Sequence, residues 1–203
     1  MSGGGVFVVL EGGEGSGKST QVARLARRLR EHGHDVVETF EPGGTALGAR
    51  VRDVFLHDSR AIDARAELFL VAADRAQHVE ELIAPALARN AIVVCDRFSP
   101  STLAYQGRAR GLPLPVVAEV CRLAEGDIEP DVVVVLDVND EVAAKRAPRD
   151  PDRLERAGED FHALVRRAYR ELAPKHRWVV VDANGDVDDV AGKVWSAVEP
   201  HLA

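Results

Sequence analysis

The stretch Gly12-Gly13-Glu14-Gly15-Ser16-Gly17-Lys18-Ser19 decides how this chain folds. It matches the pattern G-x-x-x-x-G-K-[ST] in full, and it lies between an apolar run at residues 6–10 and an amphipathic helical pattern that starts near Lys18. Glycines allow successive backbone N–H groups to turn inward around an anion, and the N-terminus of a helix adds partial positive charge. The stretch therefore predicts a phosphate-binding loop between a buried strand and a helix.

Two side chains of this loop carry its chemistry. Lys18 can reach the β- and γ-phosphates of a nucleoside triphosphate, and the Ser19 hydroxyl can bind Mg²⁺. The candidate ATP-binding residues of the loop are Gly12, Gly13, Glu14, Gly15, Ser16, Gly17, Lys18, Ser19 and Thr20. A guanine-specific GTPase needs an Asn/Thr-Lys-x-Asp element, and a transporter ATPase needs a longer chain with a Ser-Gly-Gly-Gln-like signature. Neither element occurs in the sequence, so a compact kinase remains.

Further strand-like runs alternate with helical patterns along the chain. We expect strands at residues 6–10, 35–40, 91–95, 132–136 and 178–181, and helices near residues 22–29, 62–87, 114–123, 141–146, 154–172 and 187–198. This alternation predicts an α/β fold in which a five-stranded parallel sheet is flanked by helices on both faces. No repeat or linker divides the pattern, so we expect a single domain over residues 1–203.

The composition excludes several classes of protein. The chain has 26 Lys+Arg against 33 Asp+Glu and a net charge of −7, which argues against a nucleic-acid partner. Its longest apolar runs, such as residues 132–136, are far shorter than the roughly 18 residues that cross a bilayer, and no secretory signal follows Met1, so we expect no membrane association. Two cysteines, Cys95 and Cys121, are too few for a disulfide framework; we expect both to be buried in a cytoplasmic protein.

A second charged cluster, Asp96-Arg97, directly follows the third expected strand. In a parallel sheet these side chains emerge at the carboxyl edge, beside the phosphate-binding loop. A carboxylate there can hold Mg²⁺-bound water, and an arginine can bind an acceptor phosphate. The cluster continues as Phe98-Ser99-Pro100-Ser101-Thr102-Leu103-Ala104-Tyr105-Gln106-Gly107.

With these residues, the sequence resembles the bacterial thymidylate (dTMP) kinases, which belong to the nucleoside-monophosphate kinase branch of P-loop proteins. Four blocks carry the resemblance over nearly the whole chain: residues 11–20, the Glu-Pro-Gly-Gly-Thr of residues 41–45, residues 96–107 and residues 149–155. The resemblance implies a three-layer P-loop kinase fold with a mobile lid at about residues 146–156. It also implies transfer of the γ-phosphoryl group of ATP to dTMP for dTTP biosynthesis, with Mg²⁺ as cofactor, in a homodimer formed through residues 62–87 and neighbouring helices.

The resemblance further implies a role for each matching side chain. Arg97 would bind the dTMP phosphate, Asp96 would support the magnesium shell through water, and Glu14 would face the 3′-hydroxyl of the acceptor sugar. The remaining expected contacts are Arg75 with the thymine edge, Ser101 and Thr102 near the base, Tyr105 beside C2′ where it disfavours ribonucleotides, and Asn184 near the adenine.

Two positions depart from the family pattern. Phe40 stands where members usually carry an arginine before Glu-Pro-Gly-Gly, and Val71 stands where an aromatic residue usually stacks on thymine. Phe69 lies two residues further back, about 200° away on a helix, and we expect it in the core. Without ring stacking at Val71, the sequence predicts weaker acceptor binding than in a member with phenylalanine there.

The segment 145–177 differs in charge from the rest of the chain, with ten Lys/Arg against six Asp/Glu. Pro148 and Pro151 bracket Arg149 in a stretch that is unfavourable for helix formation. The phosphate-binding loop contains no arginine, so the chain resembles members that supply one from the lid. We expect Arg149 or Arg153 to contact the transferring phosphoryl group, and we expect Glu155 to reach the sugar or magnesium region. Arg156, Arg166, Arg167 and Arg170 are expected on a solvated helix face.

The candidate catalytic residues are therefore Lys18, Asp96, Arg97, Arg149 and Arg153. Two other interpretations remain open at this point. One is a kinase for another nucleotide, deoxynucleotide or deoxynucleoside, because Val71 leaves the base selectivity undecided. The other is an ATP-dependent switch without a small-molecule substrate, although a switch has no need of an acceptor-binding arginine such as Arg97.

Overall fold

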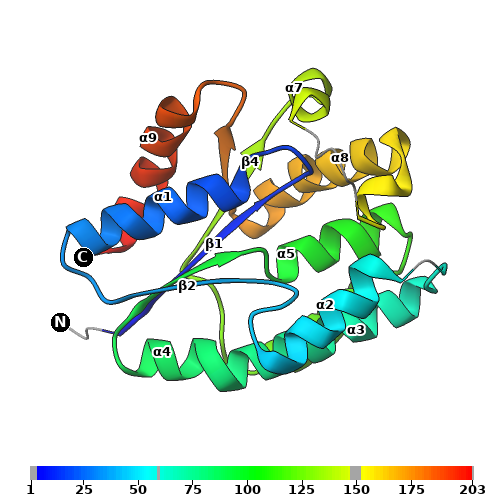
Figure 1. Ribbon diagram of the computed structural model, residues 1–203, viewed down its shortest axis with the longest axis horizontal. Helices are drawn as coiled ribbons and strands as arrows, with labels where there is room; N and C mark the ends of the chain where they lie inside the picture. The colour runs from blue at the N-terminus through cyan, green and yellow to red at the C-terminus, as the bar shows by residue number, and fades with distance from the viewer. Residues whose placement is uncertain (1–3, 59, 147–151, 203) are drawn as a thin grey trace.

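A sheet of five parallel strands in the order β2-β3-β1-β4-β5 forms the centre of the computed structural model, which describes residues 4–58, 60–146 and 152–202 (Figure 1). The strands are β1 (Val6–Gly12), β2 (Val36–Phe40), β3 (Ile92–Asp96), β4 (Val132–Asp137) and β5 (Val179–Asp182). All five predicted strands and their parallel pairing are confirmed, with ends shifted by one or two residues.

Both faces of the sheet are buried, which explains why its strands are continuous apolar runs. Alternate side chains of a strand point to opposite faces. Val8 and Leu10 of β1 pack with α1 (Lys18–Glu31) and α9 (Val187–Val198), whereas Phe7 and Val9 pack with α8 (Glu159–His176) and the segment that follows α3. Figure 1 shows α1 and α9 on one side of the sheet and α4 on the other.

The other helices join these strands. They are α2 (Ala46–His57), α3 (Ala64–His78), α4 (Ala84–Ala88), α5 (Ser99–Thr102), α6 (Leu114–Glu125) and α7 (Asp140–Lys145). Two π-helical segments, Val79–Ile83 and Leu103–Ala109, and two 3₁₀ turns, Glu155–Ala157 and Glu199–His201, complete the described elements.

Several helical predictions differ from the structure. The pattern at residues 62–87 is split by the π-helical segment Val79–Ile83, because Pro85 has no N–H to donate to the carbonyl four residues earlier. The helix expected from residue 154 begins only at Glu159, after Gly158 with a φ of 95°. Helix α2 and the helical segments at residues 99–109 were not predicted.

The core prediction for Phe69 is wrong, since 62% of the residue is exposed. Its neighbour Leu68 occupies the buried face of α3, and one residue further along a helix turns the side chain by about 100° toward solvent. Cys95 and Cys121 are buried and unpaired, as predicted.

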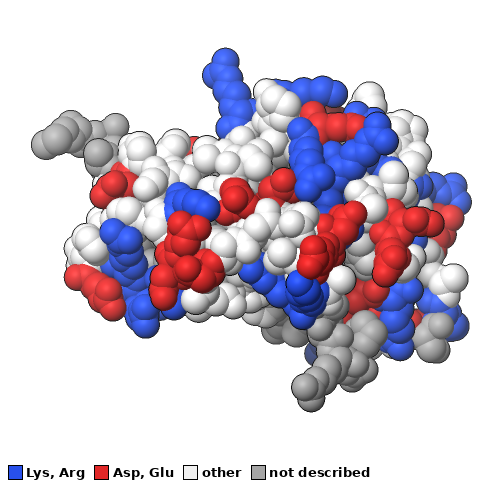
Figure 2. All heavy atoms as spheres, turned by 90° about the horizontal axis from the view of Figure 1, so that it is seen from above, with Lys and Arg blue, Asp and Glu red and all other residues white. Residues whose placement is uncertain are grey.

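The surface carries both signs of charge. In the view of Figure 2, acidic and basic side chains lie next to one another. The ion pairs of the described residues include Arg24–Asp188 and Lys193–Asp189. Among the described residues, no helix has the length and apolar character needed to cross a membrane.

Candidate active site

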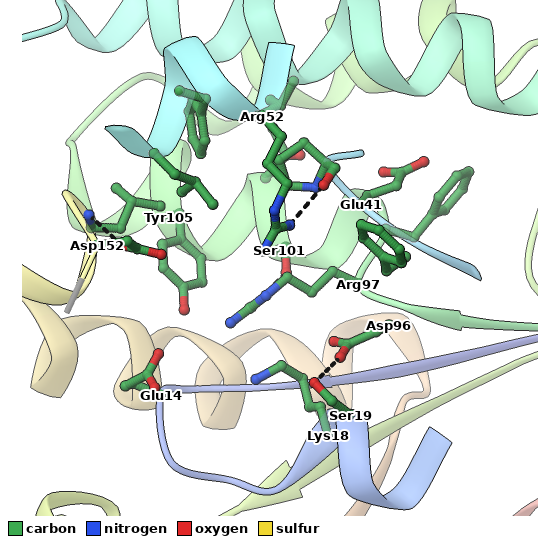
Figure 3. A pocket seen from close by; sticks show the side chains of 18 of the residues that line it. Glu14, Lys18, Ser19, Glu41, Arg52, Asp96, Arg97, Ser101, Tyr105 and Asp152 are labelled. Carbon is green, nitrogen blue, oxygen red and sulfur yellow. Dashed lines mark hydrogen bonds between the residues drawn. The ribbon is translucent and has the colours of Figure 1, made fainter. Parts of the chain in front are cut away.

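A cavity of about 690 Å³ opens at the carboxyl ends of the central strands (Figure 3). The phosphate-binding loop forms one side, the ends of β2 and β3 form the back, and α2, α3 and α5 form the opposite side. Residues from the first and the last of the four sequence blocks, such as Lys18 and Glu155, therefore line the same cavity. This is the edge of a parallel α/β sheet at which ligands bind.

The phosphate-binding loop has the conformation that its glycines predict. Gly12 has a φ of 145°, and a Cβ there would lie 2.6 Å from the Leu136 carbonyl oxygen, so glycine is required. Lys18 lies over the loop, where its Nζ donates to the Gly13 carbonyl at 2.9 Å and to Ser16 Oγ at 3.3 Å. Burial, followed by the charge of Arg97, lowers the pKa of Lys18 to about 8. The lysine is thus a desolvated cation whose charge an anionic ligand would stabilise.

Ser19 and Asp96 lie side by side, as predicted, although Ser19 is on α1 and Asp96 is the last residue of β3. Ser19 Oγ donates to Asp96 Oδ2 at 2.7 Å, and Asp96 Oδ1 is buried without a partner among the described residues (Figure 3). A buried oxygen without a donor is a ready ligand for a hard cation or its water. The donor set therefore fits Mg²⁺.

Arg97 enters the cavity from the turn after β3, with a φ of 76°. Its Nη1 donates to the Gly12 carbonyl at 3.2 Å and to Ser101 Oγ at 3.1 Å. Ser101 Oγ in turn donates to Glu11 Oε2 at 2.7 Å, and Glu11 also accepts the N–H groups of Phe98 and Ser101. Burial raises the pKa of Glu11. The hydrogen bonds that Glu11 accepts therefore hold the strained turn that directs Arg97 into the cavity.

The far end of the cavity holds Arg75, which is only 2% exposed. Its Nε donates to Glu41 Oε2 at 2.9 Å and its Nη2 donates to Thr102 Oγ1 at 3.1 Å. Val71 and Tyr105 line the same cavity. The structure therefore brings the expected base-side residues together, and it adds Glu41 as the buried partner that fixes Arg75.

Arg52 is a cavity residue that the sequence analysis missed. It lies on α2, and its Nη1 donates to the Pro42 carbonyl at 2.7 Å while its Cζ lies 5.4 Å from the centroid of the Phe40 ring. Figure 3 shows Arg52 and Arg97 entering the cavity opposite Lys18. The sequence signal that could have located α2 is the N-cap residue Thr45, whose side chain accepts the Gly48 N–H at 3.0 Å.

Two expected site residues, Arg153 and Asn184, are not part of this arrangement. Arg153 does not line the cavity: its guanidinium pairs with the buried carboxylate of Glu67 at 2.6 Å. Asn184 is engaged at the end of β5, where it accepts the Asn139 N–H at 3.0 Å and donates to Asp182 Oδ1 at 2.6 Å. Arg149 lies outside the described residues, as do the other residues from 147 to 151 of the expected lid.

One arginine expected in solvent is buried instead. Arg166 is 8% exposed, pairs with Asp140 at 2.6 Å, and lies so close to the phosphate-binding loop that a Cβ on Gly13 would approach its Cγ to 3.0 Å. The prediction of a solvated face is therefore wrong for Arg166. It holds for Arg167, whose side chain is 75% exposed.

The cavity thus combines a phosphate-binding loop, a Ser–Asp pair that suits Mg²⁺, and arginines on the acceptor side. Residues 10–194 match the family model described as thymidylate kinase. The chain is 47% identical over 199 residues to the thymidylate kinase of Synechococcus sp. strain JA-3-3Ab, covering 97% of both chains. It is 45% identical to that of Deinococcus radiodurans, covering 96% of both.

Solved structures agree with these relatives. The thymidylate kinase of Ehrlichia chaffeensis superimposes with a TM-score of 0.78 at 31% identity, over 96% of this chain and 99% of that one. The match therefore includes the sheet, the phosphate-binding loop and the acceptor side together. The chain belongs to the thymidylate kinase family, the ATP-dependent phosphotransferases that convert dTMP to dTDP.

Proposed function

We propose that this cavity carries out the family's reaction with the phosphate-binding loop and Lys18 on ATP, and with Arg52 and Arg97 on the phosphate of dTMP. One observation carries the assignment: these three cations line a single cavity, and none forms an ion pair with a carboxylate of the described residues. Cations left without a carboxylate partner in a partly desolvated cavity favour a polyanionic ligand. By contrast, Arg75 is neutralised by Glu41 and suits an uncharged base edge.

Positioning and charge neutralisation account for the chemistry in this proposal. The dTMP phosphate has a second pKa of about 6, so at neutral pH it is already the anionic nucleophile and no general base is needed. Lys18 and Arg97 lie on opposite sides of the space between the two phosphates and stabilise the charge of the transferring group. Arg149 remains the predicted lid arginine for that group.

The other acceptor contacts are proposed from the family resemblance, and the residues concerned line the cavity. Glu14, in the phosphate-binding loop, faces the 3′-hydroxyl of the sugar, and Tyr105 occupies the space that a 2′-hydroxyl would need. Val71, Ser101 and Thr102 lie on the base side. On the donor side, Asn184 and the loop after β5 hold the adenine.

Mg²⁺ is the proposed cofactor. Ser19 would bind it directly and Asp96 would bind it through water, which uses the unpartnered Asp96 Oδ1. When bound, the ion would neutralise charge on the ATP phosphates. The hydrogen bond from Ser19 Oγ to the other carboxylate oxygen, Asp96 Oδ2, at 2.7 Å holds the two side chains together at the mouth of the phosphate-binding loop.

A homodimer is proposed through the outer face of α3 and α6. Three large apolar residues are exposed there: Phe69 at 62%, Val116 at 54% and Leu123 at 78%. Exposed large apolar residues on two helices that pack against each other support a protein contact. Replacing Leu123 with glutamate is expected to give a monomer in light scattering. The proposal also includes one functional domain in the cytoplasm, in line with the single sheet and two free thiols.

One assay tests the proposed function. ADP release is measured with dTMP, dUMP, dGMP, UMP, CMP and thymidine as acceptors, with Lys18→Ala as the control for loop-dependent chemistry. We expect release with dTMP above all others. Preference for thymidine over dTMP would contradict the assignment of Arg52 and Arg97 to an acceptor phosphate.

A further inference from the structure

Arg153 is tied to the acceptor side of the cavity and not to the phosphate-binding loop. Its Nη1 donates to Glu67 Oε1 at 2.6 Å, and its Nε donates to the Phe55 carbonyl at 2.8 Å. Its backbone N–H donates to the Leu56 carbonyl at 3.0 Å. The side chain is 14% exposed and its remaining nitrogen, Nη2, is buried. Both main chain and side chain of Arg153 are therefore fixed against the end of α2 and the start of α3.

Glu67 is the centre of this contact. It is fully buried on the first turn of α3 and accepts hydrogen bonds from three side chains. Arg110 donates two, at 3.1 and 3.0 Å, Arg153 donates one, and Gln106 donates one at 3.3 Å. Moving Arg153 to the phosphate-binding loop would break its bonds to Glu67 and to the Phe55 and Leu56 carbonyls, and only Arg110 would remain to neutralise the buried carboxylate.

The residues next to Arg153 form a rigid piece of the cavity wall. Asp152 Oδ1 accepts the N–H groups of Leu154 at 2.8 Å and Glu155 at 2.9 Å, while Glu155 Oε2 accepts the N–H of Asp152. This reciprocal arrangement is a capping box. Asp152, Leu154 and Glu155 all line the cavity, and Figure 3 shows Asp152 at its edge.

Leu154 connects this wall to the base side of the acceptor pocket. It packs against the cluster of Phe55, Leu56 and Val71, and Val71 is the position that the sequence analysis assigned to the thymine. The Arg153 bonds to Phe55 and Leu56 therefore hold Leu154 at that cluster. A loss of these bonds would loosen the wall beside the base.

We propose that Glu67 and Arg153 form a positioning pair that fixes the wall of residues 152–155 against the base side of the acceptor pocket and so sets the affinity for dTMP. Arg153 is in this view not a contact of the transferring phosphoryl group. The inference rests on the proposed function of the cavity. It separates the two lid arginines, which the sequence treated as equivalent candidates.

Steady-state kinetics with Arg153→Gln tests the pair. The bond lost lies within the protein, so only part of its free energy reaches the ligand, and we expect the lower end of the range for charged hydrogen bonds, about tenfold in affinity. We expect the KM and the calorimetric Kd for dTMP to rise about tenfold, with an unchanged KM for ATP and a kcat within about threefold of the wild-type value. Arg153→Lys, which keeps the charge opposite Glu67, should restore part of the dTMP affinity. Arg167→Gln is the matched control, because Arg167 is exposed on α8 and its side chain bonds only Glu171 among the described residues.

Glu67→Gln gives an independent test of the partner. It should show the same change in dTMP affinity, and the double variant Glu67→Gln/Arg153→Gln should lose less than the product of the two single effects. If Glu67→Gln does not fold, Arg153→Gln and Arg153→Lys decide the question alone.

Two results would overturn the inference. A kcat about a hundredfold or more lower in Arg153→Gln, with dTMP affinity retained, would mean that Arg153 contacts the transferring group. Unchanged dTMP affinity and unchanged kcat would mean that the pair positions nothing. Failure of the proposed function is distinguishable, because the wild-type protein would then not phosphorylate dTMP at all.

Discussion

Replacing Arg52 with alanine is expected to weaken binding of the acceptor phosphate selectively. Arg52 lies on α2, forms no ion pair among the described residues, and donates a single hydrogen bond, to the Pro42 carbonyl at 2.7 Å. Its guanidinium therefore has free N–H groups directed into the cavity that also holds Arg97 and Lys18. A phosphate bound there would supply the missing anion.

The magnitude follows from the kind of bond that is lost. A hydrogen bond between charged groups contributes about 1.5–3 kcal/mol, and every 1.4 kcal/mol is tenfold in affinity. Arg52→Ala should therefore raise the Kd and KM for dTMP by about 10- to 150-fold. The variant should stay folded with reduced stability, because it loses the bond from the charged guanidinium to the Pro42 carbonyl, worth about 1.5–3 kcal/mol, and the contact with the Phe40 ring, worth about 0.5–1 kcal/mol, while alanine is a good helix former.

The assay compares dTMP with thymidine, which has the same base and sugar but no phosphate. Calorimetric titration should show that Arg52→Ala binds thymidine as the wild-type protein does and binds dTMP much more weakly. Arg50→Ala is the control, since Arg50 is exposed on the same helix. Equal losses for both ligands would refute the reasoning, because they would mean that Arg52 supports the shape of the pocket and not the phosphate.

Three further perturbations probe the other parts of the cavity. Because the pKa of Lys18 is lowered to about 8, the free enzyme loses this charge as the pH rises, and kcat/KM for ATP should fall about tenfold per pH unit above that value. Lys18→Arg stays charged, so its pH profile should lack this descending limb. A descending limb that persists in Lys18→Arg would mean that another group titrates. Asp96→Asn should raise the Mg²⁺ concentration for half-maximal activity about tenfold without changing binding of metal-free ATP, and an unchanged Mg²⁺ titration would remove Asp96 from the metal shell. Val71→Phe should lower the KM for dTMP and the Kd for thymidine alike, by about fivefold or more, because stacking on a base contributes about 1–3 kcal/mol. If neither ligand binds more tightly, the thymine does not lie against α3.

The sequence predicted best those features that depend on residues adjacent to one another along the chain. The strands of a sheet that is buried on both faces are continuous apolar runs, so all five were predicted from the sequence. The phosphate-binding loop was predicted for a similar reason, because its anion site is made from consecutive backbone N–H groups between Gly12 and Ser19. Helix α2 was missed because Gly43-Gly44 precedes its N-cap and a further glycine, Gly48, lies in its first turn, and such closely spaced glycines are typical of a loop.

Charged side chains were harder to place, since their partners are distant in sequence. Arg153 and Glu67 are 86 residues apart, and no local pattern relates them. Arg166 and Asp140 are a similar case, separated by 26 residues. A run of arginines in a helical pattern is compatible with solvent, with a buried pair or with a ligand. The choice among these depends on which carboxylate the fold brings to each one.

Phe40 shows how a departure from the family pattern can be interpreted once the fold is known. Its ring lies 5.4 Å from the Arg52 guanidinium, within the range of a cation–π contact worth about 0.5–1 kcal/mol at an exposed site. Gly43 lies between the two, and a Cβ there would approach the Phe40 ring to 2.7 Å and Arg52 Cδ to 3.0 Å. A glycine is thus needed for the contact. An arginine at position 40 would add a cation to this end of the cavity, whereas phenylalanine orients the cation that α2 already supplies. The acceptor site therefore depends more on Arg52 in this chain than the motif at residues 41–45 indicates.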